Sequence, residues 1–170
     1  MRSPGAVARR VVALYEGDAR RPVRGYAVVL GSYAGLVSTL ALVARSSGVR
    51  LPERVELADV ALMGVATHKA SRLLTKDAVT SPLRAPVARF EEETGLGEVN
   101  ESPRGHGVRH AAGELATCPF CLAIWVATGL TAGLVFAPRL TRLVAGMLSA
   151  VAASDTLQIG YDAARQWVRK

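Results

Sequence analysis

The amino-acid sequence predicts an all-α integral membrane protein, a four-helix bundle with a long cytosolic loop between its second and third spans. Three observations support this prediction. Half of the 170 residues are hydrophobic, and the mean hydropathy is +0.23. The apolar residues gather in four runs, each near the length that crosses a ~30 Å hydrocarbon core. The arginines lie mainly between these runs, as they do where they flank membrane spans.

The first two predicted spans differ in how clearly their sequences indicate a membrane crossing. Residues 26–44 form a run of 19 residues without a charge. Residues 57–74 form the weakest run, because it contains several polar and charged side chains. These are Asp59, His68, Lys69 and Arg72. The run is either a span whose polar side chains face the bundle interior or an amphipathic helix at the membrane interface. Asp59 is interpreted as a solvated helix start, where a carboxylate is favourable.

The segment between the second and third spans, residues 75–117, is predicted to be a polar cytosolic loop. It contains three prolines, several glycines and the acidic cluster Glu91–Glu93. One short helix is expected around residues 85–94. The acidic cluster is interpreted as a solvated surface.

The last two predicted spans are residues 118–137 and residues 143–161. The third contains 20 residues and no charge, whereas the fourth contains Asp155. Small residues recur every four positions in three of the spans, a spacing that favours close helix packing but also arises by chance in Ala/Gly-rich helices. These positions are Gly31 and Gly35, Gly129 and Gly133, and the series Gly146, Ala150 and Ser154.

The charge distribution predicts the topology. Four spans (membrane domain, residues 26–161) place the basic N-terminal segment 1–25, the long loop and the tail 162–170 on one side. That side holds 16 of the 21 Lys and Arg residues, and the other side holds five. The positive-inside rule therefore predicts a multi-pass cell-membrane protein with both termini in the cytoplasm. The net charge of +7 is attributed to this asymmetry and not to nucleic-acid binding, because no aromatic residues interleave with the basic ones.

Four polar residues are predicted to form an intramembrane polar site, three in the cytoplasmic third of the second span and one deeper in the fourth. They are His68, Lys69, Arg72 and Asp155. A charge inside a bilayer is costly, so Asp155 is expected to pair with Lys69 or Arg72. The pair either locks two helices together or lines a polar pocket that opens to the cytosol. In the second case, Asp155 would serve as a proton or cation site in a small transporter.

The motif C-P-F-C begins the third span. Pro119 suits a first helical turn, so Cys118 is expected at the N-cap and Cys121 one turn later. A helix N-terminus favours the thiolate, which is the form that exchanges electrons or binds Zn²⁺. His106 and His110 would complete a zinc site of two histidines and two cysteines, provided that the intervening helix breaks near Gly113. Zinc binding, thiol redox chemistry and simple packing therefore stay open as alternatives.

Four sequence blocks resemble a bacterial membrane family, the domain-of-unknown-function family 1360. The blocks are ATHKASRLLTKDAVTSPLRAP, EVNESPRG, GELATCPFCLAIWVA and SDTLQ, within residues 57–161. The resemblance implies a small multi-pass membrane protein, and members of the family include a Bacillus protein linked to sporulation. It implies no reaction, cofactor or catalytic residue. The blocks contain the polar residues predicted at the cytoplasmic face: His68, Lys69, Arg72, Lys76, Asp77, Arg84, Glu98, Asn100, Cys118, Cys121 and Asp155.

The function predicted from the sequence is that of a non-enzymatic structural or partner-binding membrane component, and the family resemblance suggests a link to sporulation. Its expected partners are the lipid bilayer and either a protein partner or further copies of the chain. The alternatives are a cytosol-facing thiol or zinc site at Cys118 and Cys121, and the small transporter based on Asp155. The sequence contains no G-x-S-x-G, Walker A or H-E-x-x-H motif, so the common hydrolase patterns are excluded.

Overall fold

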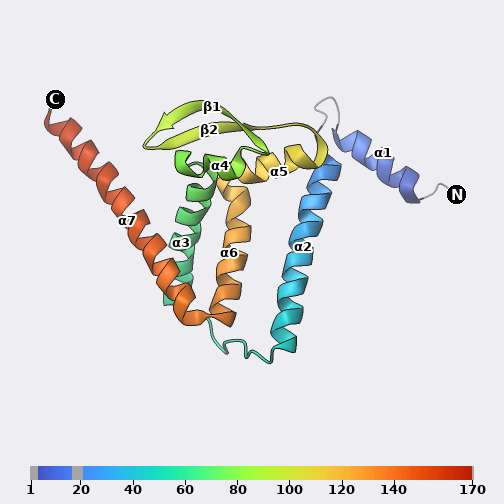
Figure 1. Ribbon diagram of the computed structural model, residues 1–170, viewed down its shortest axis with the longest axis horizontal. Coiled ribbons are helices and arrows are strands. Elements are labelled where there is room, and N and C mark those ends of the chain that lie inside the picture. Colours follow the sequence, from blue (N-terminus) through green and yellow to red (C-terminus); the bar gives the residue numbers. More distant parts are fainter. Residues whose placement is uncertain (1–3, 17–20, 170) are drawn as a thin grey trace.

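The computed structural model describes residues 4–16 and 21–169 of the chain. The described part is mostly helical and contains one two-stranded sheet (Figure 1). Its elements are α1 (Pro4–Glu16), α2 (Val23–Ser46), α3 (Leu57–Thr75), η2 (Ala78–Thr80), α4 (Ser81–Arg84), β1 (Ala88–Gly95), β2 (Glu98–Pro103), α5 (Gly107–Thr117), α6 (Pro119–Phe136) and α7 (Pro138–Val168).

All four predicted spans are helices, and three of them, α2, α6 and α7, are long and apolar enough to cross a membrane. The helix α3 is not among these three, because Asp59, Lys69 and Arg72 interrupt its apolar residues. The helices α2 and α6 run in one direction and α3 and α7 in the other (Figure 1). As a result, α1, the sheet and the C-terminal end of α7 all lie at one end of the molecule.

The structure does not show the predicted four-helix bundle. The helix α3 packs between α6 and α7, whereas α2 contacts mainly α5. A Cβ atom on Gly25 of α2 would lie 2.5 Å from the carbonyl oxygen of Gly107, so only glycine fits this contact. The helix α7 leans away from the others toward its C-terminal end (Figure 1).

The close helix approaches do not fall on most of the predicted small-residue positions. Nothing lies within 4 Å of a Cβ built at Gly31, Gly35, Gly129 or Gly146. Gly133 of α6 is the exception, since a Cβ there would lie 2.5 Å from Thr141 Oγ1 of α7. Ala66 of α3 and Ala145 of α7 are both 0% exposed. Small residues therefore do lie where helices meet, as in membrane helix pairs, but mostly at other sites than predicted.

Residues 76–117 are not a loop but an ordered unit, which we call the cap. It consists of η2, α4, the hairpin of β1 and β2, and α5. The helix expected around residues 85–94 is wrong, because β1 occupies this stretch and pairs antiparallel with β2. Gly95, Leu96 and Gly97 all have positive φ and form the turn between the strands. Glycine adopts this conformation without steric cost, so the turn favours a hairpin over a continued helix.

The helix α7 is longer than its predicted span. It begins at Pro138, directly after α6, and continues to Val168, through most of the predicted tail. The predicted N-terminal segment likewise contains a helix, α1.

Candidate functional site

Arg84 is the centre of the polar network in the cap. Its side chain is 2% exposed and forms an ion pair with Glu101, which is 5% exposed. All five N–H groups of a guanidinium are donors, and here each has an acceptor. The acceptors are Glu101 Oε2, Leu74 O (3.0 Å), Asp77 O (3.0 Å), Thr80 Oγ1 (2.5 Å) and Ser81 Oγ (3.2 Å). One side chain therefore joins the end of α3, η2, α4 and β2.

A second ion pair attaches β2 directly to α3. Arg72 donates from Nε to Glu98 Oε1 at 3.0 Å and from Nη2 to Oε2 at 2.5 Å. This two-bond geometry is the most specific that a carboxylate and a guanidinium form. The backbone N–H of Val99 also donates to the carbonyl of Lys76 at 2.8 Å. The Arg72–Glu98 pair thus holds the cap on α3, and the backbone bond ties β2 to the residue that directly follows α3.

The predicted ion pair of Asp155 is present, and its partner is Lys69. The distance between Lys69 Nζ and Asp155 Oδ2 is 2.8 Å, and it joins α3 to α7. Ser149 donates to the carbonyl of Leu62 at 3.2 Å, closer to the other end of the same helix pair. Of the four residues predicted to form the intramembrane polar site, Lys69 and Asp155 therefore come together. Arg72 pairs with Glu98 instead, and His68 is exposed.

Asp59 also has a partner that the sequence did not indicate. Arg142 of α7 donates to both oxygens of Asp59, at 2.9 Å and 2.7 Å. The residue is therefore part of a helix contact and not simply a solvated helix start. All three charged residues of α3 that interrupt its apolar surface, Asp59, Lys69 and Arg72, are paired with residues of other elements.

The predicted zinc site does not assemble. Among the described residues, no three His, Cys, Asp or Glu side chains come together in a way that could hold a metal ion. The reason is that α5 continues through Gly113 without a break. His106 lies at the start of α5 and Cys118 follows its end, which at 1.5 Å per residue separates them by about 18 Å. Nε2 of His110 instead lies 3.6 Å from Oε1 of Glu114, one turn further along α5.

The two cysteines occupy the predicted positions in the helix. Cys118 is the N-cap of α6 and Pro119 follows in its first turn. The Sγ of Cys118 accepts a hydrogen bond from the backbone N–H of Cys121 at 3.2 Å. In the described structure, both cysteines are free thiols. The Cys118 side chain therefore caps the start of a helix, which is a structural role.

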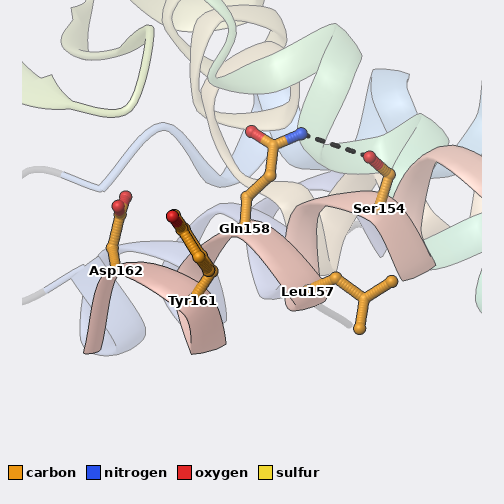
Figure 2. A pocket seen from close by; sticks show the side chains of 5 residues that line it. All are labelled: Ser154, Leu157, Gln158, Tyr161 and Asp162. Carbon is orange, nitrogen blue, oxygen red and sulfur yellow. Dashed lines mark hydrogen bonds between the residues drawn. The ribbon is translucent and has the colours of Figure 1, made fainter. Parts of the chain in front are cut away.

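A shallow hollow of about 340 Å³ lies on α7 along residues 154–162 (Figure 2). Figure 2 shows its lining side chains, all from this one helix, with Gln158 donating to Ser154 at 3.2 Å. The lining residues are Ser154, Leu157, Gln158, Tyr161 and Asp162. Neither Lys69 nor Asp155 lines it. The hollow is therefore not the polar pocket that was predicted around the Lys69–Asp155 ion pair.

Sequence reasoning named Arg84 among the polar residues of the cytoplasmic face but missed Glu101 and the pairing of the two. Both residues lie in a polar, proline-containing segment that gives no sign of burial. The only available signal was the turn G-L-G between two short segments, which is typical of a hairpin and would have placed Glu101 on a strand.

Comparison with known proteins agrees with the membrane family suggested by the sequence blocks. The family model described as "Protein of unknown function (DUF1360)" matches residues 62–161. The sporulation protein YjcA of Bacillus subtilis (strain 168) is 34% identical over 71 residues, which are 40% of this chain and 60% of the relative. The chain therefore matches less than two thirds of that relative. No solved structure matches. The family match runs from α3 into α7 and contains the whole cap.

Proposed function

The chain belongs to the DUF1360 family, and we propose that it is a non-enzymatic membrane protein that presents its cap to a protein partner in the cytoplasm. The observation that carries this proposal is that the buried Arg84 side chain is bonded entirely within the cap and the end of α3. A buried guanidinium with all five donors bonded within the cap holds a shape and leaves no donor for a substrate. The family description names no activity, so the proposal rests on this geometry.

The hairpin is the part of the cap best suited to meet a partner. Two-stranded hairpins are marginal on their own in water, and this one is anchored through β2 by Glu98, Val99 and Glu101. Within the described residues β1 pairs with β2 alone, so its other edge is unpaired. Seven of its eight residues are exposed. An unpaired edge is a common site for an added strand from a partner.

The charge of β1 favours a partner with a basic segment. Glu92 and Glu93 are exposed on the strand, and Phe90 beside them is 57% exposed. Acidic side chains at an edge also prevent pairing between identical copies, since like charges would meet. We therefore place a different protein, and not a second copy, at this edge.

The membrane arrangement that we propose has four spans, with α3 crossing beside α6 and α7. The charges of Asp59, Lys69 and Arg72 make α3 less apolar than the other long helices. Their ion pairs offset the free-energy cost of placing these charges in a membrane. The positive-inside rule then places both ends of the chain and the cap in the cytoplasm. The printed name of the Bacillus subtilis relative suggests spore formation as the first process in which to look for the partner.

Photo-crosslinking in living cells of the source bacterium tests the proposal. A photoreactive phenylalanine replaces Phe90, and the matched control carries it at Leu83, which is 69% exposed on α4. We expect a discrete protein adduct from position 90 and none from position 83. The adduct should be lost when Glu92→Lys and Glu93→Lys are added, with the amount of membrane-inserted protein unchanged.

The proposal fails if position 90 gives no protein adduct, or if both positions give the same adducts. It also fails if the adduct persists at full yield in the Glu92→Lys, Glu93→Lys variant, because a basic segment would no longer find acidic side chains there.

A further inference from the structure

The helix α1 carries an exposed apolar row that no other described element covers. The row consists of Val7 (50% exposed), Val11 (60%), Leu14 (77%) and Tyr15 (74%). The spacing of four, three and one residues places all four on one face of a helix with 3.6 residues per turn. Ala13 lies on the other side of the helix and is also exposed.

Arginines lie close to this row in the sequence. Arg10 lies at the border of the row and is exposed, and Arg24 in the first turn of α2 is exposed as well. Arg21, which precedes α2, is also exposed, and its Nη1 lies 3.9 Å from Glu114 Oε1. The first 25 residues of the sequence contain six arginines and two acidic residues. A helix with an apolar face and arginines beside it is typical of segments that lie in the interface of an anionic membrane.

The position of α1 brings it to that interface. Six residues separate the end of α1 at Glu16 from the start of α2 at Val23. The helix α2 is long and apolar enough to cross a membrane, so its start marks the membrane boundary. Figure 1 shows α1 beside this end of α2 and directed outward, away from α3, α6 and α7.

We propose that α1 lies flat on the bilayer, with the row of Val7, Val11, Leu14 and Tyr15 inserted among the acyl chains and the nearby arginines on anionic lipid headgroups. Two features select the membrane as the occupant of this face. The row is continuous along the chain with a membrane-spanning candidate, and its charge complements anionic lipids. This role of α1 is independent of the partner proposed for β1, because β1 is a different, acidic surface in the cap.

Tryptophan fluorescence in lipid nanodiscs tests the proposal on the full chain. The two native tryptophans are replaced, as Trp125→Phe and Trp167→Phe, and a single tryptophan is introduced by Val11→Trp. The matched control is Ala13→Trp, about 200° around the helix from Val11 at 100° per residue. The discs hold one chain each and contain phosphatidylglycerol and lipids brominated on their acyl chains.

We expect brominated lipid to quench Val11→Trp several-fold more than Ala13→Trp, with emission shifted to shorter wavelength only for Val11→Trp. Adding Arg10→Gln and Arg24→Gln should reduce the quenching of Val11→Trp in discs with phosphatidylglycerol. Near-equal, weak quenching at both positions would overturn the proposal, since α1 would then lie in water. Quenching of Val11→Trp that needs two chains in one disc would also overturn it and assign the face to a second copy.

Discussion

Arg84 determines the shape of the cap at the scale of single residues. A guanidinium buried to 2% exposure is tolerated only because Glu101 neutralises it and four further acceptors satisfy its donors. Its acceptors belong to α3, η2, α4 and β2, or directly flank them. Loss of the one carboxylate therefore loosens four segments together.

Glu101→Gln should destabilise the folded protein by about 3 kcal/mol, because it leaves the buried Arg84 charge without a counter-charge. The measurement is the free energy of unfolding in detergent, with Glu92→Gln as control. Glu92 is exposed on the same hairpin, so its change should stay within about 0.5 kcal/mol.

The double variant Arg84→Met, Glu101→Leu separates charge burial from simple damage to the hairpin. It removes both charges and should be more stable than Glu101→Gln alone. If Glu101→Gln unfolds at the same denaturant concentration as the wild type, Arg84 is not the centre of the cap.

Paired charges explain the behaviour of α3 at the scale of elements. Its Asp59, Lys69 and Arg72 each meet an opposite charge on α7 or β2. A hydropathy count treats every charge as unpaired and so excludes α3 from the candidate spans. Two of the three ion pairs join α3 to α7, and the third joins α3 to β2.

Asp155→Asn should weaken the contact between α3 and α7 by about 2 kcal/mol, because Lys69 then lies among apolar helices without its carboxylate. Unfolding in detergent, or loss of folded protein from the membrane, measures this effect. The control is Asp162→Asn, an exposed position two turns along the same helix.

Adding Lys69→Met to Asp155→Asn should restore most of the stability, since neither charge remains. An Asp155→Asn protein as stable as the wild type would show that the ion pair contributes nothing to the packing of α3 on α7.

The sequence allowed prediction of features that follow from local pattern. The apolar runs gave the four long helices, and the cost of a charge in a bilayer gave the pairing of Asp155 with Lys69 or Arg72. Pro119 gave the N-cap position of Cys118. Two other contacts between separate segments were missed, because neither Asp59 with Arg142 nor Arg84 with Glu101 has a local signature. A short helix was expected around residues 85–94, whereas the Gly95–Gly97 turn and the pairing with β2 make most of this stretch a strand.

The alternating directions of the long helices give the whole molecule two different ends. One end carries α1, the cap and the end of α7, and the other carries the short connections between α2 and α3 and between α6 and α7 (Figure 1). If the four helices cross the membrane, the cap stands entirely on one side. This arrangement depends on α3, which is the only long helix that the structure describes between residue 46 and the hairpin.

Cysteine accessibility in whole cells tests this arrangement most directly. Single cysteines are introduced as Arg50→Cys, between α2 and α3, and as Glu92→Cys, in β1. The native cysteines are replaced by serine, as Cys118→Ser and Cys121→Ser. The hydroxyl introduced by Cys118→Ser can still accept the helix-capping hydrogen bond, since serine is a favoured N-cap residue.

A membrane-impermeant maleimide should label Arg50→Cys in intact cells and label Glu92→Cys only after the membrane is opened. That result would place α3 across the bilayer and the cap in the cytoplasm. Labelling of both positions from the same side would contradict the account, because α3 would then not cross.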